Sequence, residues 1–195
     1  MNLLDTNTLD FNSLDFISPE KIKGSFISLV KYKGEDIYVK TPLFKYSEDI
    51  IKTESKTFLN LEFDETNISF YEFLCNLDEF AVKKIHENSL EWFNKEFPLD
   101  VIEDFFVSIL KHKQMPKIKI HISSGSKNLE YTLTDRNDNK IDSLKNNEKV
   151  SVILKFTGLK FLKQKVISEW NVVKIISDFE SYENLITDNI DLEIE

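Results

Sequence analysis

The chain has 195 residues and a mass of 22.9 kDa, enough for one domain with a real core and too few for two of ordinary size. Its sixteen Phe and two Trp need burial, which excludes a fully disordered chain. No apolar run approaches the roughly 18 residues of a membrane span, and the N-terminus lacks the features of a signal peptide. A single cysteine, Cys75, cannot form an internal disulfide. We therefore expect an intracellular protein that is not secreted and has no membrane partner.

Charge is distributed unevenly along the chain, whose net charge is −9. Residues 21–60 carry eight lysines and five acids, a net of +3, and residues 111–177 carry thirteen lysines, one arginine and six acids, a net of +8. Residues 1–20 (−4), 61–110 (−9) and 178–195 (−7) are acidic. Because a phosphate ligand responds to the local field, the two basic stretches leave a nucleic-acid ligand possible.

The first part of the chain predicts a loosely held arm and then three strands. Residues 1–20 mix acids with scattered apolar residues and form the arm. Residues 26–32 and 36–40 are rich in β-formers and flank a Lys-Gly turn, which predicts a hairpin. Residues 57–63 alternate weakly and predict a third strand.

A helical segment is predicted over about residues 69–113. Apolar residues recur there at three- and four-residue spacing, as in one stripe of an amphipathic helix, and Pro98 begins a second helix expected to run to about Lys113. Asp78, Glu79 and Glu87 are read as a solvated helix face and Cys75 as a packing residue. The stripe consists of Phe70, Phe73, Leu74, Leu77, Ala81, Ile85, Ser89 and Trp92.

Alternating strand patterns return after the helices, at residues 117–122, 129–133, 150–157 and 166–176. Three strands, a helical segment and three or four strands match the order of an OB-fold, a five-stranded Greek-key barrel with a helix between strands 3 and 4. We therefore predict an α+β, mainly β fold of this kind. An α+β sandwich with helices on one face is the alternative. The domain would span residues 21–177, followed by an acidic tail at 178–195.

Lysines and aromatic rings occur together around the first hairpin and between the last two strands. Single-stranded DNA binding needs both, because ammonium groups neutralise phosphates and flat rings stack on unpaired bases. For Phe156 and Trp170 the core is the better reading, while for Phe161 stacking and core packing stay open. The candidate nucleic-acid-binding residues are Lys31, Tyr32, Lys33, Tyr38, Lys40, Lys155, Lys160, Phe161, Lys163 and Lys165.

The acidic tail carries seven acids and no base, interleaved with apolar residues. It could solubilise the protein, dock as a terminal helix, or compete with DNA for a basic groove while offering a motif to protein partners. Competition would weaken DNA binding and sharpen its salt dependence. The candidate partner-binding residues are Phe179, Glu180, Tyr182, Asp188 and Asp191.

No pattern in the sequence indicates an enzyme. The three histidines are scattered without metal-ligand spacing, and there is no P-loop, CxxC, HExxH or GxSxG motif. We expect no catalytic residue, no metal and no cofactor.

The stretches at residues 70–78 and 87–93, the Gly-x-Lys-Phe-x-Lys segment at 158–163 and the following Trp170 resemble proteins of nucleocytoplasmic large DNA viruses. These are similar to the phage single-stranded-DNA-binding protein that has one OB-fold and an acidic tail. The resemblance covers about residues 24–177.

The resemblance implies a homodimer that coats single strands without sequence preference in DNA replication and recombination. It would place Lys160, Phe161, Lys163 and Lys165 at the DNA and would assign replication partners to the tail. One departure is that the phage tail ends in an aromatic residue, whereas this chain ends in Glu195. The rival hypothesis is a viral structural or interaction protein that uses the barrel as a scaffold and the acidic helices as a contact surface.

Overall fold

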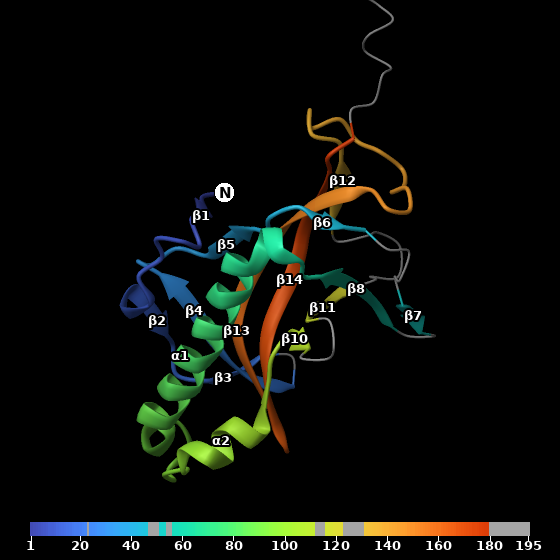
Figure 1. Ribbon diagram of the computed structural model, residues 1–195. Helices are drawn as coiled ribbons and strands as arrows, with labels where there is room; N and C mark the ends of the chain where they lie inside the picture. Colours follow the sequence, from blue (N-terminus) through green and yellow to red (C-terminus); the bar gives the residue numbers. More distant parts are fainter. Residues whose placement is uncertain (23, 47–50, 54–55, 112–115, 123–130, 180–195) are drawn as a thin grey trace, which may run out of the picture.

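The computed structural model describes residues 1–22, 24–46, 51–53, 56–111, 116–122 and 131–179. It is an α+β, mainly β fold, as predicted (Figure 1). Along the chain, the two helices follow one group of strands and precede another. No helix in these ranges is both long and apolar enough to cross a bilayer. The elements are β1 (Leu3–Leu4), β2 (Leu14–Phe16), β3 (Glu20–Ile22), β4 (Ser25–Tyr32), β5 (Ile37–Lys40), β6 (Phe44–Lys45), β7 (Ile51–Thr53), β8 (Lys56–Glu62), α1 (Ile68–Phe93), α2 (Leu99–Phe105), β9 (Phe106–Val107), β10 (Leu110–Lys111), β11 (Lys117–Ile122), β12 (Thr132–Thr134), β13 (Lys149–Leu162) and β14 (Lys165–Ser177).

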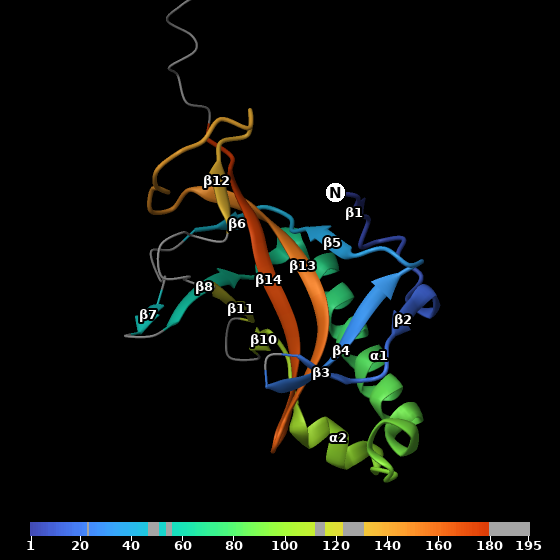
Figure 2. The ribbon, with the colours of Figure 1, turned by 180° about the vertical axis from the view of Figure 1, so that it is seen from behind.

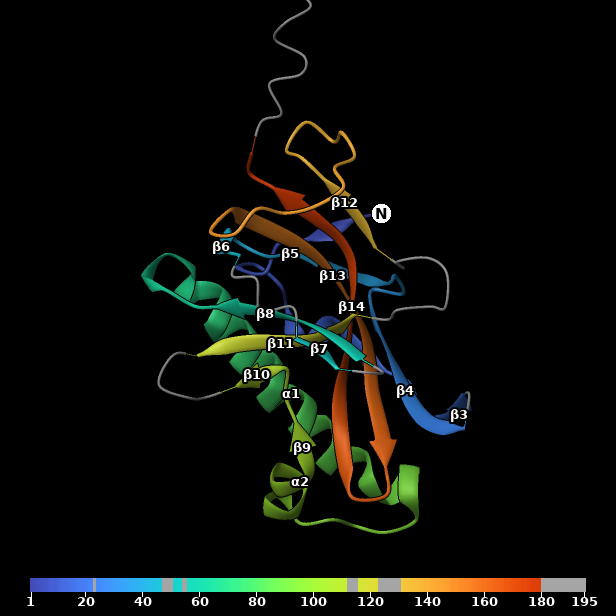
Figure 3. The same cartoon turned by 90° about the vertical axis from the view of Figure 1, so that its right-hand side faces the viewer.

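The long antiparallel pair β13–β14 is the central element of the barrel (Figure 2). On its other edge β13 pairs in succession with β4, β5 and β6. A second sheet has the order β10-β11-β8-β7. Because β11 lies beside β14 and β6 lies beside β8, the two sheets close a ring of strands around one core (Figure 3).

Buried and partly exposed side chains alternate along β14 and the middle of β13, whereas residues 150–154 of β13 are buried on both faces of the strand. Leu154 and Phe156 of β13, and Trp170 and Val172 of β14, are all buried. Register shifts interrupt the pairing after Ile153 and after Phe156. Such bulges increase the local twist, which helps a long hairpin follow the curve of a barrel.

The predicted hairpin at residues 26–40 is wrong in its pairing. Lys33 and Gly34 do make a tight turn with positive φ angles of 51° and 84°, and Tyr32 and Glu35 exchange backbone hydrogen bonds across it. Beyond that bridge the strands separate. Both β4 and β5 run antiparallel to consecutive segments of β13, and β2 pairs with the end of β4 instead. Local turn chemistry predicted the turn, but a distant strand determines the pairing.

The first twenty residues are part of the fold rather than a loosely held arm. Leu14 is buried at 6% exposure, and the ring of Phe11 stacks on Phe73 of α1 with centroids 6.0 Å apart. In addition, β1 pairs with β5, and β2 and β3 pair with β4. The scattered apolar residues of this segment are therefore anchors against α1 and the barrel.

Helix α1 buries the predicted apolar stripe against the barrel, from Phe70 through Ser89, with Trp92 partly buried. The second helix is shorter than predicted. It ends at Phe105 because the next residues are drawn into the sheets, Phe106–Val107 beside β14 and Leu110–Lys111 beside β11. The helical insertion therefore does not continue to residue 113.

Gly158 generates the first testable prediction. Its φ is +143°, and a Cβ there would lie 2.0 Å from the carbonyl oxygen of Ser28 on β4. We expect Gly158→Ala to lower the free energy of unfolding by roughly 2–4 kcal/mol, through backbone strain and overpacking together. Urea unfolding monitored by circular dichroism measures it. Gly34→Ala is the control, because Gly34 also has a positive φ but an open surrounding. Equal losses in the two variants would mean that the close approach of β4 is unimportant.

Candidate nucleic-acid interface

The outward side of β4, β5 and β13 carries four lysines and the ring of Tyr38, and we call it the basic face. Tyr38 and Lys40 alternate on β5 with the buried Ile37 and Val39, so they point away from the core. Lys155 lies opposite Tyr38 in the pairing of β13 with β5, and its Nζ is 5.5 Å from the ring centroid. The ring and the lysines therefore share one surface. The members of the basic face are Lys31, Tyr38, Lys40, Lys155 and Lys160.

Asp36 connects two of these lysines. Its carboxylate pairs with Lys155 at 2.5 Å and also with Lys31, and these groups are about a third exposed. Hydrogen bonds from Lys155 and Lys31 lower the pKa of Asp36 to about 2, and the hydrogen bond with Asp36 raises the pKa of Lys155. Asp36 and Lys155 are therefore charged at neutral pH, and the carboxylate is already held where an anionic ligand would bind.

The basic face continues along β13 and β14 in both directions. Toward the hairpin end, Lys160 pairs with Glu169 at 3.6 Å, and the Asn171 side chain donates to Thr157 Oγ1 at 2.8 Å. Toward the other end, Lys40 and Lys174 flank Ile153 in the pairing register. Lys174 pairs with the exposed Asp138. The lysines thus extend along several neighbouring strands, each paired or flanked by polar partners that include the acids Asp36, Glu169 and Asp138.

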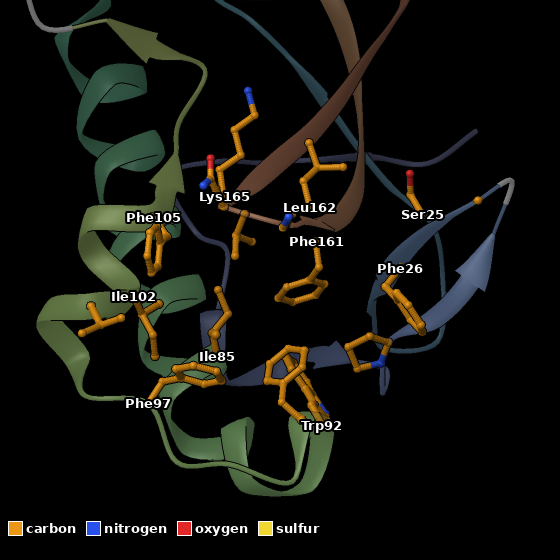
Figure 4. A pocket seen from close by; sticks show the side chains of 17 residues that line it. Ser25, Phe26, Ile85, Trp92, Phe97, Ile102, Phe105, Phe161, Leu162 and Lys165 are labelled. Atoms are coloured by element: carbon orange, nitrogen blue, oxygen red, sulfur yellow. The ribbon is translucent and has the colours of Figure 1, made fainter.

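A pocket of about 600 Å³ lies on the other side of the same strands, at the end of the β13–β14 hairpin (Figure 4). Phe161 contacts Trp92 and Phe93 at centroid distances of 6.1 and 5.1 Å. Lys163 and Lys165 are exposed at the hairpin tip and line the pocket. We call this the aromatic pocket. Its lining rings are Phe26, Trp92, Phe93, Phe97, Phe105 and Phe161.

The structure divides the ten candidate residues among three places. Five lie on the basic face and three in the aromatic pocket. The remaining two, Tyr32 and Lys33, lie at the turn after β4, where the Tyr32 ring packs against the core and the Lys33 Nζ is 5.1 Å from that ring. Tyr32 is therefore not a free stacking surface. Phe156 and Trp170 are buried with centroids 4.8 Å apart, which confirms the core reading.

Only one of the predicted partner-binding residues falls within the described ranges. Phe179 is 41% exposed, and Lys145 Nζ lies 4.4 Å from its ring centroid. The other four, Glu180, Tyr182, Asp188 and Asp191, lie outside those ranges.

Several residues of these two surfaces were missed by sequence reasoning. Asn171 and Glu169 alternate with the buried Ser168 and Trp170, so a strict period-2 reading of β14 would have found them. Asp36 and Phe26 carried no comparable signal. Their roles depend on the pairing of β4 and β5 with a segment more than one hundred residues later.

The prediction that Asp78 lies on a solvated helix face is wrong. The chain after α2 returns along this part of α1, where Asp78 forms a hydrogen bond with Ser108 and lies close enough to Lys111 to feel its charge. Burial raises the pKa of Asp78 to about 6 and lowers the pKa of Lys111. The described side chains include no group of three His, Cys, Asp or Glu suited to a metal ion.

The chain belongs to the family of unknown function DUF5871, whose model matches residues 49–183. No curated protein matches it. Among solved structures it is similar to the single-stranded DNA-binding protein from bacteriophage Enc34, with 11% identity, a TM-score of 0.48, and 86% of this chain and 91% of that chain covered.

The Enc34 protein in complex with single-stranded DNA has 13% identity and a TM-score of 0.45, covering 85% of this chain and 96% of that chain. For gp2.5, a single-stranded DNA-binding protein encoded by bacteriophage T7, the values are 9%, 0.47, 80% and 98%. With identities this low, the function of this chain has to be inferred from its own residues.

The raised pKa of Asp78 predicts a stability that increases on mild acidification. The folded-state pKa of about 6 lies above the ordinary value of 3.8, so the folded state binds the proton first. The stability that protonation of Asp78 adds to the folded state is therefore lost as pH rises through 6 and regained as pH falls below 6. We expect the free energy of unfolding to increase by about 1 kcal/mol between pH 7.5 and 5, measured by urea unfolding. Asp78→Asn should abolish this increase. An unchanged pH dependence in that variant would assign it to another group.

Proposed function

We propose that this protein binds single-stranded DNA without sequence preference and is not an enzyme. The observation that carries the proposal is the basic face itself. Lys155 lies 5.5 Å from the centroid of the Tyr38 ring, and Lys31, Lys40 and Lys160 lie on the same outward sheet surface of a protein whose net charge is −9. Such a local concentration of lysines favours an anionic ligand, and a ring beside one of them favours a ligand that carries flat groups.

The proposed mechanism has two parts. Lysine ammonium groups contact successive phosphates and release condensed counterions, which supplies affinity that does not depend on sequence. The Tyr38 ring, half-buried beside Lys155, offers a surface on which a base can stack. Stacking needs an unpaired base, so this combination selects single strands over duplex DNA.

Carboxylates on the basic face moderate the affinity. Asp36 and Glu169 already partner three of the lysines, so a phosphate has to displace them before it can pair. Exposed ion pairs contribute only about 0–1 kcal/mol each, so the displacement costs little. The basic face therefore binds DNA reversibly. A protein that coats single strands needs this property, because it must leave the strand again.

We extend the proposal to viral DNA replication and recombination, in accord with the family resemblance of the sequence. In this hypothesis the protein acts as a homodimer, and the acidic tail at residues 178–195 competes with DNA for the basic face and recruits replication proteins. The seven acids of the tail are the supporting observation. A synthetic peptide of residues 178–195 should compete with labelled DNA if the tail has this role.

A second candidate function is that of a viral structural or protein-interaction module. The acidic helical segment supports it, because Leu90 and Leu99 are 56% and 43% exposed beside acids such as Glu91 and Asp100. Pull-down with the intact protein distinguishes the two candidates. Recovery of virion proteins without any replication factor would favour this one.

Fluorescence anisotropy with a labelled oligo-dT over a salt series tests the proposed function. We expect tight binding at low salt, and in Lys155→Gln/Lys160→Gln a weaker affinity with a log–log salt slope shallower by about 0.7 per lysine. The control is Lys83→Gln/Lys84→Gln, which removes the same charge from α1. No binding by the unmodified protein at low salt would refute the function. Equal effects of the two double variants would refute the site.

Removal of the carboxylate between two lysines should have the opposite effect. In Asp36→Asn, Lys31 and Lys155 lose their shared partner and become available to phosphates. We expect binding of oligo-dT to become several-fold tighter, with a steeper salt slope. The neighbouring Glu35→Gln is the control, because it makes the same change in net charge one residue away. If both variants bind equally more tightly, the general field and not the pair limits affinity.

A further inference from the structure

We infer that the aromatic pocket at the hairpin end is a second binding site, which takes up a nucleobase of the strand bound on the basic face. This inference rests on the proposed function and deepens it. It replaces the simple picture of Phe161 as an exposed stacking residue with a pocket lined by residues of three strands, β4, β13 and β14, and of two helices, α1 and α2.

The shape of the pocket suits a flat ring. Its volume of about 600 Å³ lies within the range of small-molecule sites, about 300–1,000 Å³. Phe161, Trp92 and Phe93 contact one another edge to face, with interplanar angles of 61° to 88°. Phe26 is 52% exposed and lines the same pocket, so one ring is accessible to a ligand that enters. Figure 4 shows Phe26, Trp92 and Phe161 around a common space.

The charge of the pocket has a single sign. The charged side chains that line it are Lys163 and Lys165, both exposed at the hairpin tip, and the other lining groups are apolar, aromatic or neutral. The acids of α2 do not line it, whereas Val101, Ile102 and Phe105 of that helix do. A ligand that combines a flat apolar ring with an adjacent anion fits this arrangement, and a nucleotide within a DNA strand is such a ligand.

The pocket and the basic face lie on opposite sides of the same strands and meet at the hairpin tip. Lys160 and Phe161 are neighbours on β13, so their side chains point to opposite sides of the sheet. Their partners on β4, Ile27 and Phe26, are divided in the same way. A strand that follows the lysines of the basic face reaches the pocket by passing around the hairpin tip, where Lys163 and Lys165 can hold its phosphates.

Intrinsic fluorescence gives a direct test in the full-length protein. Trp92 lines the pocket, whereas Trp170 is buried in the core at 5% exposure. A labelled oligo-dT and an abasic oligonucleotide of the same length are titrated in parallel, with anisotropy reporting binding and tryptophan emission reporting occupancy of the pocket. We expect both to bind, but only oligo-dT to quench the emission. The quenching should disappear in Trp92→Phe.

A substitution at the pocket mouth completes the test. Phe26→Ala should weaken oligo-dT about fivefold or more, the low end of the loss of one stacked base, and leave the abasic strand unchanged. Leu90→Ala is the control, since Leu90 is 56% exposed, close to the 52% of Phe26, but lies on α1 outside the pocket lining.

Each other outcome overturns the inference in a distinguishable way. Binding of oligo-dT without quenching, and with Phe26→Ala equal to Leu90→Ala, would refute the pocket but leave the proposed function intact. Absence of any anisotropy change at low salt would refute both. Quenching of Trp92 by a peptide of residues 180–195 but not by oligo-dT would mean that the pocket binds an acidic peptide instead.

Discussion

The antiparallel pairing of β13 with β14 is the interaction on which the rest of the structure depends. These strands of 14 and 13 residues form one edge-to-edge contact from Val150 to Leu162, and β13 offers its other edge to β4, β5 and β6. Both the core and the candidate interface are therefore built on opposite faces of the same hairpin. At Gly158 the backbone of β4 approaches β13 so closely that no side chain larger than hydrogen fits there without displacement. A glycine at this position is therefore a condition for the pairing of β4 with β13.

Alternation along β13, shifted by one residue at the bulge after Phe156, separates two kinds of chemistry. Lys155 and Lys160 point outward, while Phe156, Leu159 and Phe161 point inward. Within the barrel the inward side is a sealed core. Near the hairpin tip the strands project beyond the barrel, and the inward side becomes the lining of the aromatic pocket, closed by the end of α1 and by α2. The same repeating pattern thus gives core at one end of the hairpin and a candidate site at the other.

The sequence predicted the elements whose pattern is local and long. The apolar stripe of α1 and the alternation of β11 and β14 were correct, since each is determined by burial of one face over many residues. The strand predicted at 150–157 was too short, because β13 continues to Leu162 and carries Lys160 and Phe161 on a strand rather than on a connection. The pairing of β4 and β5 could not be predicted in this way. Their tight turn suggests a hairpin, and only the presence of β13 explains why they separate. Asp78 illustrates the same limit, because its neutralising environment comes from a segment thirty residues later.

The distribution of charge along the sequence predicted which strands carry the candidate interface, but not which side chains pair with one another there. The basic segments identified the strands that carry the basic face, in spite of a net charge of −9. They did not reveal that Asp36 lies between Lys31 and Lys155, which are far apart in sequence. Since screening at physiological salt limits exposed charges to about 8 Å, such contacts matter more for a bound phosphate than the distant acids of the helices do. An acidic protein can therefore present a basic surface, provided that its carboxylates are on other faces or are weakly held partners.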